Sequence, residues 1–107
     1  MIESAPFDIL FDPKVKQHLR AIEAKYYGLI RETIDLQLKF EPDIETRNRK
    51  PLRQPAAFAA TWELRLGPKN YFRVLYEFDL DRREVQILAI GIKEGNRLIV
   101  GGQEIEL

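Results

Sequence analysis

The stretch from Thr61 to Gly91 alternates apolar and polar residues in three runs that are separated by polar turns. The apolar positions recur at every second residue: Trp62, Leu64 and Leu66, then Phe72, Val74, Tyr76 and Phe78, then Val85, Ile87 and Ala89. This period, bounded by Gly, Pro, Asn and Asp, is typical of consecutive antiparallel strands. The third run is also apolar at Leu88 and Ile90, so we expect a central strand that is covered on both faces.

Two helical stripes precede these strands. The first follows Asp12-Pro13, a typical N-cap and first-turn pair, and repeats at Val15, Leu19, Ile22 and Tyr26. The second repeats at Tyr27, Ile30, Ile34 and Leu38. A rod of about 27 residues would be long for so small a domain, so a tight turn near residues 24–28 and two antiparallel helices are expected. His18 lies beside the first stripe and is interpreted as an ordinary surface or boundary residue.

The remaining segments complete the expected fold. Phe7 to Phe11 predicts a short strand, Asp43 to Ala60 a polar linker with Pro51 and Pro55, and Arg97 to Val100 another short strand. The sequence therefore predicts one α+β domain over residues 1–107, with an N-terminal strand, a two-helix hairpin and an antiparallel meander of three to four strands. The helices pack on one face of this sheet. The second face then needs either the C-terminal segment or another polypeptide to cover it.

The strand pattern also predicts the register of the first hairpin. Matching the apolar faces places Leu66 opposite Phe72, and it sets Arg65 directly across from Arg73 on the other face. Like charges at such positions destabilise a sheet by roughly 0.2–1 kcal/mol. Either both arginines are exposed and screened, or an anion lies between them. Phosphate is the anion that a guanidinium fork suits best.

Composition narrows the chemistry. The chain has 107 residues, 17 basic and 17 acidic, with one histidine and no cysteine. This excludes disulfides, thiolate catalysis and a site of several histidines, and we expect no metal and no cofactor. No apolar run approaches about 18 residues and no basic-then-apolar N-terminus is present, so we expect a cytoplasmic protein without a membrane span or signal peptide. Residues 47–53 read RNRKPLR, a local basic patch in a neutral chain.

The order of elements resembles the RelE/ParE superfamily of toxins from bacterial type II toxin–antitoxin systems. The resemblance covers nearly the whole chain and rests on five segments: TRNRKPLR (46–53), WELRLG (62–67), FRVLYEFD (72–79), VQILAIGIKEGNRL (85–98) and GGQE (101–104). It implies a RelE-like fold, a cognate antitoxin as partner and, in the RelE branch, a metal-independent endoribonuclease that cuts messenger RNA on the ribosome.

The resemblance also implies site residues. Arg65 and Arg73 match basic positions on neighbouring strands, and Lys93 stands where a basic residue follows the Ile-Gly pair. The residues expected to bind the RNA backbone are Arg47, Arg49, Lys50, Arg53 and Arg97. Cleavage needs a base for the 2′-hydroxyl, cations for the phosphorane and an acid for the leaving oxygen. The arginines suit the second role because they stay charged.

Acid and base are open at this stage. Glu63 lies two residues from Arg65 on the same strand face and is the candidate base, with Glu77 farther along; Glu63 could instead simply pair with an arginine. Lys93 is the candidate acid, if nearby cations lower its pKa, or else a solvated loop lysine. Tyr71 or Trp62 would supply base stacking.

Three departures from the family pattern keep other functions open. Glu63 stands where active relatives often have lysine, neither tyrosine nor histidine follows Tyr76, and the chain is neutral where such nucleases are typically basic. The alternatives are a ParE-type toxin that inhibits DNA gyrase without enzymatic activity, and a degenerate member that only binds antitoxin.

Overall fold

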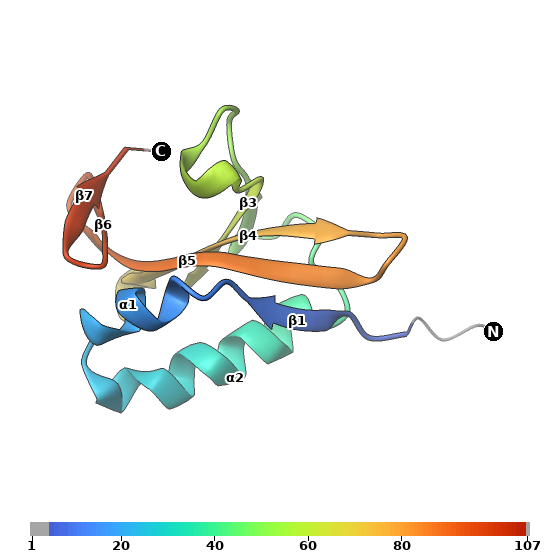
Figure 1. Cartoon of the computed structure of the whole chain (residues 1–107), viewed down its shortest axis with the longest axis horizontal. Helices are drawn as coiled ribbons and strands as arrows, with labels where there is room; N and C mark the ends of the chain where they lie inside the picture. Colours follow the sequence, from blue (N-terminus) through green and yellow to red (C-terminus); the bar gives the residue numbers. More distant parts are fainter. Residues whose placement is uncertain (1–4, 107) are drawn as a thin grey trace.

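The computed structural model describes residues 5–106, which form a twisted sheet with two helices on one side (Figure 1). The elements in chain order are β1 (Asp8–Phe11), α1 (Val15–Arg20), η1 (Ala24–Tyr26), α2 (Tyr27–Leu38), β2 (Arg49–Pro51), η2 (Ala57–Ala59), β3 (Trp62–Leu66), η3 (Pro68–Asn70), β4 (Phe72–Asp79), β5 (Glu84–Glu94), β6 (Arg97–Val100) and β7 (Gln103–Ile105). The α+β class and the presence of two helices are as predicted, but the first helix already ends at Arg20 and α2 continues through Gly28, so the turn lies earlier than expected. The linker differs, because it contributes the short edge strand β2.

The sheet has seven strands in the described part of the chain, and β5 is its longest member. Strands β2 to β7 follow one another in antiparallel order, whereas β1 pairs with β5 in parallel. The predicted register of β3 and β4 is confirmed, with Leu66 opposite Phe72 and Arg65 opposite Arg73. Pro51 ends β2 at the edge of the sheet, where a missing N–H donor is tolerated.

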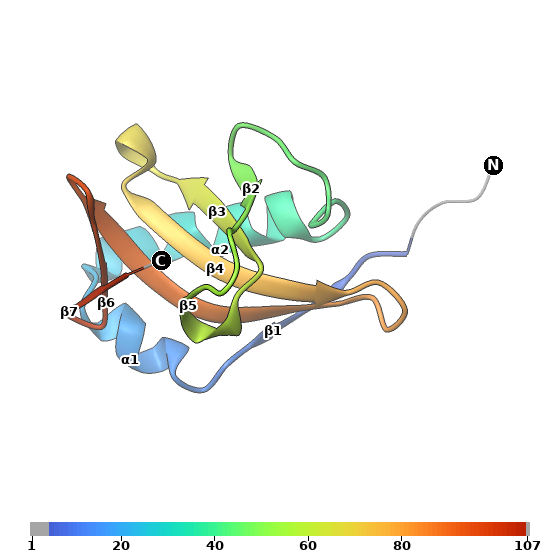
Figure 2. The ribbon, with the colours of Figure 1, turned by 90° about the horizontal axis from the view of Figure 1, so that it is seen from above.

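The helices cover one face of the sheet (Figures 1 and 2). In α2 the predicted stripe is the buried one: Ile30, Ile34 and Leu38 lie against the sheet. Helix α1 is short, and Asp12 precedes it in a turn where its side-chain oxygen accepts a hydrogen bond from the Lys14 amide at 2.9 Å. The larger hydrophobic core forms between the helices and the strand side chains that point toward them, such as Leu64 and Val74.

A β-bulge in β5 changes the predicted pattern of the third run. Tyr76 pairs with Ile87, but the next residue back along β4, Leu75, pairs with Ala89, so Leu88 is an extra residue. The bulge turns Ala89 to the face away from the helices and returns Ile90 to the helix-covered face. The prediction that Ala89 shares a face with Val85 and Ile87 is therefore wrong.

The second face is covered by parts of the same chain. Leu52, Phe58 and Ala60 come from the segment between β2 and β3, and Leu98, Val100 and Ile105 come from the C-terminal hairpin β6–β7. They pack with Leu75, Leu88 and Ala89 into a second, smaller hydrophobic cluster. From the sequence, either the C-terminal segment or another polypeptide was expected to cover this face. The C-terminal segment covers part of it, and residues 52–60 cover the rest of the cluster.

Candidate functional site

One carboxylate and two guanidinium groups meet on the sheet face opposite the helices. Glu63 on β3 accepts a hydrogen bond from Arg65 Nε at 2.8 Å and one from Arg73 NH1 at 3.3 Å, both at Oε1. Arg73 also donates its Nε to the Asn70 carbonyl at 3.2 Å. Alternation along β3 and the direct pairing of residues 65 and 73 bring the three side chains together. We refer to Glu63, Arg65 and Arg73 as the arginine–carboxylate cluster.

The cluster explains how two arginines face each other across the sheet. Glu63 is 3% exposed and Arg73 is 8% exposed, so the interpretation that both arginines are exposed and screened is wrong. An anion does lie between them, but it is the chain's own Glu63 carboxylate. A buried charge without an oppositely charged partner costs free energy, so the carboxylate compensates the charge of the buried guanidinium group. Only the Arg65 side chain, 37% exposed, opens substantially to solvent.

The other two catalytic candidates occupy the same sheet face in different surroundings. Lys93 follows Gly91, the partner of Arg73, by two residues along β5, and it is half-buried. Its backbone amide donates to the Tyr71 carbonyl at 2.8 Å. Glu77 shares a face with Arg73 four residues along β4 but is exposed. The structure thus groups Glu63 with both arginines and leaves Glu77 outside the cluster.

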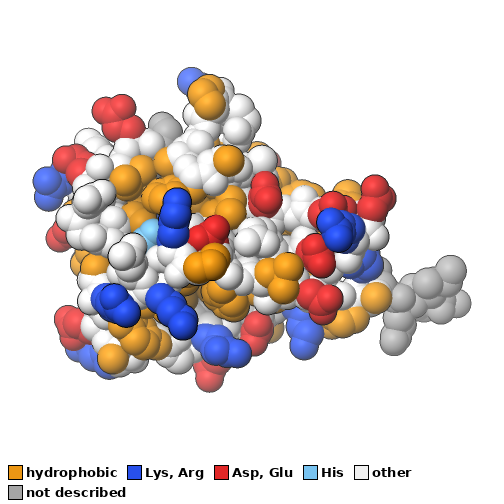
Figure 3. All heavy atoms as spheres, viewed as in Figure 1, with side chains coloured by type: hydrophobic (Ala, Val, Ile, Leu, Met, Phe, Trp, Pro, Cys, Tyr) orange, Lys and Arg blue, Asp and Glu red, His pale blue; other side chains and the backbone are white. Residues whose placement is uncertain are grey.

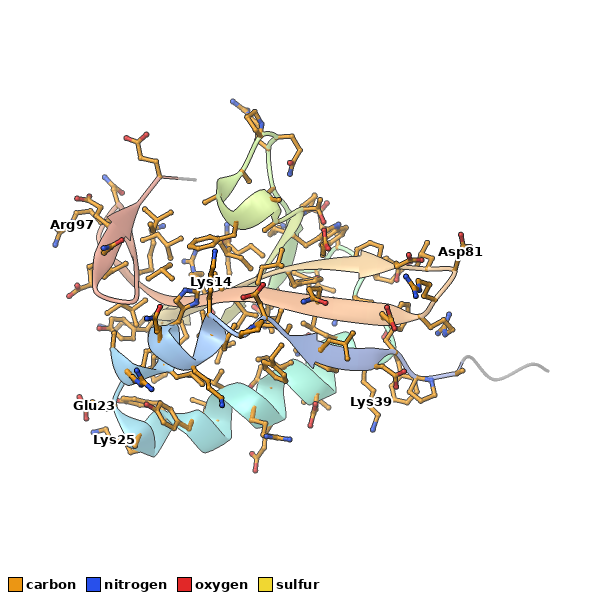
Figure 4. The ribbon with its side chains drawn as sticks, in the orientation of Figure 1. Lys14, Glu23, Lys25, Lys39, Asp81 and Arg97 are labelled. Carbon is orange, nitrogen blue, oxygen red and sulfur yellow. The ribbon has the colours of Figure 1, made fainter. Side chains whose placement is uncertain are left out.

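The predicted RNA-binding residues do not form one patch. Arg49 is buried on the helix-covered face, where it donates to the Ile44 carbonyl at 2.9 Å and to the Gln37 carbonyl and side-chain oxygen, both at 2.8 Å. It joins the end of α2 to β2, and the prediction that it contacts RNA is contradicted by this burial. The other candidates lie elsewhere: Lys50 bonds Glu45 at 3.3 Å, Arg47 and Arg53 are exposed, and Arg97 points outward from β6 (Figure 4).

The two aromatic residues expected to stack on RNA bases do not lie on the sheet face that carries the arginine–carboxylate cluster. Trp62 packs in the larger core against Tyr76 and Phe78. Tyr71 packs edge-on against Phe72 beside the α1–η1 turn. Both therefore lie on the helix-covered side of the sheet, away from the arginine–carboxylate cluster. On the cluster's own face, the aromatic side chain in the second hydrophobic cluster is Phe58.

His18 is the functional-looking residue that the sequence interpretation missed. It is 7% exposed, and its Nδ1 accepts a hydrogen bond from the Ile90 amide at 3.3 Å. Burial, helped by the nearby Lys14 charge and opposed by Asp12, lowers the pKa of His18 from its ordinary value of 6.5. A signal was present in the sequence, because residues 15, 18 and 22 are spaced as one helical stripe.

A groove lined mainly by apolar side chains lies on the helical side. It has a volume of about 380 Å³ and lies between the end of β1, α1 and α2. Val15, Leu19, Tyr27, Ile30 and Ile34 form its apolar lining. Lys16, Arg31 and Asp12 also line it, and Lys and Arg side chains gather over these two helices (Figure 3). Residues 5–106 contain neither a group of three or more metal-ligating side chains nor a helix long and apolar enough to cross a membrane.

Comparison with known proteins places this fold. Neither a protein-family model nor a curated protein matches the chain. Among solved structures, it is similar to a chain of the toxin–antitoxin complex RelBE2 from Mycobacterium tuberculosis, with a TM-score of 0.67 and 25% sequence identity. The alignment covers 85% of this chain and 95% of that chain. This similarity supports a RelE-type toxin, in agreement with the resemblance seen in the sequence.

The RelE/ParE fold accounts for the position of the cluster. The two helices occupy one face of the sheet, and the arginine–carboxylate cluster lies on the other, between the edge strand β2 and the central strand β5. The RelE-like fold predicted from the sequence is confirmed.

Proposed function

We propose that this chain is the toxin of a type II toxin–antitoxin pair and a metal-independent endoribonuclease that cleaves messenger RNA on the ribosome. The observation that supports this most directly is the convergence of Glu63, Arg65 and Arg73 on one sheet face. A carboxylate beside two fixed cations combines a proton acceptor with groups that stabilise a phosphorane. The similarity to a chain of a toxin–antitoxin complex supports the wider role.

The proposed reaction assigns one step to each group. Glu63 takes the proton of the ribose 2′-hydroxyl, and the 2′-oxygen attacks the adjacent phosphorus. Arg65 and Arg73 stabilise the charge that develops on the phosphorane oxygens. As the bond to the 5′-oxygen breaks, Lys93 donates a proton to that leaving oxygen. The products are a 2′,3′-cyclic phosphate and a free 5′-hydroxyl, so no water and no metal enters the bond-breaking step.

A second candidate function rests on the same contacts. Because the Glu63 carboxylate already bonds both guanidinium groups, their charge is compensated before any RNA arrives. This favours a toxin that acts by binding, such as a ParE-type inhibitor of DNA gyrase, or a member that only binds antitoxin. The two candidates differ in whether RNA is cut.

For the antitoxin, we propose the groove between α1 and α2 as its docking surface. The lining is mainly apolar, and its charged members are two cations, Lys16 and Arg31, against one acid, Asp12, so an apolar segment with acidic flanks fits it. Arg65 on the opposite face, together with the exposed Arg47 and Arg53 of the segment around β2, is left for RNA. Lys16→Glu with Arg31→Glu would then weaken antitoxin binding while message cleavage continues.

This function can be tested by inducing expression of the chain in bacterial cells. The experiment is done with and without co-expression of an antitoxin gene that neighbours the gene of this chain. We expect growth to stop and messages to be cleaved, and Glu63→Gln to reduce cleavage by about 10²–10⁴-fold. Glu77→Gln is the matched control, since it changes an exposed carboxylate on the same sheet face. Arrested growth with intact messages and DNA damage would support gyrase inhibition instead, and harmless expression would support an antitoxin binder. Purified protein that cuts RNA only after divalent metal is added would contradict the proposed mechanism.

A further inference from the structure

His18 occupies a gap along the edge of β5. The parallel partner β1 reaches only as far as Ile87, whose carbonyl accepts a hydrogen bond from the Asp12 amide at 2.8 Å. The antiparallel partner β6 begins its pairing at Gly91. Between these two, the Ile90 amide donates to His18 Nδ1 at 3.3 Å. A side chain from α1 thus accepts the Ile90 amide in the gap between the pairings of β5 with β1 and with β6.

The same imidazole contacts two segments that cover the second sheet face. Its ring meets the Phe58 ring edge-on, with centroids 5.6 Å apart. At the β6–β7 turn, a side chain added at Gly101 would come within 3.5 Å of His18 Cδ2. Phe58 and the following Ala59 have φ values of 61° and 57°, a left-handed conformation that non-glycine residues adopt at a cost of about 1–2 kcal/mol each. The packing of Phe58 on His18 helps to hold this strained segment against the sheet.

We propose that His18 is an acid-sensitive latch: its neutral imidazole holds β5 and the Phe58 segment together, and protonation at Nδ1 releases them. A protonated Nδ1 carries a hydrogen and has no lone pair to accept from the Ile90 amide. The bond breaks, and a cation is left in a site with little solvent. This inference rests on the packing of His18 and does not depend on a toxin function.

The charged groups around the imidazole set the direction of the effect. Asp12 and Lys14, both in the segment that leads into α1, are the charges that act on it, and Lys14 rises from that segment on the side where η2 lies (Figure 4). Strand β5 contributes the Ile90 amide, η2 the Phe58 ring and the β6–β7 turn a glycine, all uncharged. Burial and Lys14 outweigh Asp12, so the pKa of His18 is lowered in the folded state.

The lowered pKa determines whether the stability contributed by His18 rises or falls with pH. The unfolded chain, with an ordinary histidine pKa of 6.5, binds the proton more readily than the folded chain does. The stabilising contribution of His18 is therefore complete above that value. It is lost as the pH falls from there through the lowered pKa of the folded state.

Because the chain has one histidine, NMR follows the latch without ambiguity. Between about pH 8 and pH 5 we expect the imidazole to titrate below the ordinary histidine value, and hydrogen-exchange protection of the Ile90 amide to fall about tenfold, the equivalent of one hydrogen bond. Amides of residues 57–60 should lose protection over the same pH range. Titration at or above the ordinary value, or Ile90 protection that does not follow it, would overturn the proposal.

His18→Asn is the matched variant, since its side-chain oxygen takes the place of Nδ1 and does not titrate in this range. The wild type should lose thermal stability between about pH 8 and pH 5 by more than the variant does, and this difference isolates His18 from the carboxylates. Equal pH dependence in the two proteins would also overturn the latch. If the variant does not fold, the titration of the wild type decides the question alone.

Discussion

The two faces of the sheet are covered in different ways. On the face toward the helices, fourteen described residues are buried in one cluster, supplied by two helices and by regular strand alternation. On the other face the cluster has five buried residues, and its cover is a loop that contains the single 3-10 turn η2, together with a short hairpin. Each face also buries an arginine: Arg49 on the first binds uncharged oxygens, and Arg73 on the second binds a carboxylate.

One face therefore provides most of the stability, and the other carries the charged groups. The helix-covered face holds the core that decides whether the chain folds, because the free energy of folding comes mainly from buried apolar area. The second face holds charged groups and strained backbone, which proteins keep where a function requires them. A cover made of loops also opens more easily than packed helices do.

Removing core volume under the helices should have the largest effect. Ile34 is 1% exposed and faces the sheet from α2, so Ile34→Ala should lower the free energy of unfolding by about 3–4 kcal/mol. Leu36→Ala is the control, because Leu36 lies on the same helix and is 79% exposed. Its effect should stay within about 0.5 kcal/mol. Urea denaturation measures both, and similar losses would show that α2 is not packed as described.

The buried arginine of the first face comes next. Arg49→Leu removes the donor of three hydrogen bonds and leaves the Ile44 and Gln37 carbonyls without that partner, so it should cost about 2 kcal/mol. Arg47→Leu, two residues away and exposed, should change stability by less than about 0.5 kcal/mol. If Arg49 acted on RNA instead, its replacement would leave the unfolding free energy unchanged and weaken RNA binding.

The same contrast shows what the sequence could reveal. The register of β3 and β4 and the buried stripe of α2 follow from local periodicity, so the pattern of a few adjacent residues was enough to predict them. Strand parity likewise placed Glu63 on one side with Arg65 and Arg73. The burial of Arg49 was hidden, since it depends on where the segment after α2 turns. The bulge at Leu88 interrupts the alternation within one strand, and the position of His18 depends on a contact between residues 72 apart in the chain.

Two glycines offer the test with the smallest expected effects. Replacement by alanine should lower the free energy of unfolding in the cover of one face and raise it in the cover of the other. Gly95 lies in the turn between β5 and β6 with φ +60°, so Gly95→Ala should destabilise the protein by about 1–2 kcal/mol through backbone strain. Gly28 lies in α2, where an added Cβ would meet nothing within 4 Å beyond its chain neighbours and the backbone of its own helix. Gly28→Ala should therefore stabilise by about 0.5 kcal/mol, since alanine is the better helix former.

The two variants also differ in what they loosen. Strain at Gly95 acts on the hairpin that supplies Leu98 and Val100 to the second face, so hydrogen exchange should speed up in β6 and β7 more than in α2. Gly28→Ala should slow exchange in α2 and leave the hairpin unchanged. A uniform change in both regions would mean that the two covers open as one unit, and the separation between a stabilising face and a more mobile, charge-bearing face would then be wrong.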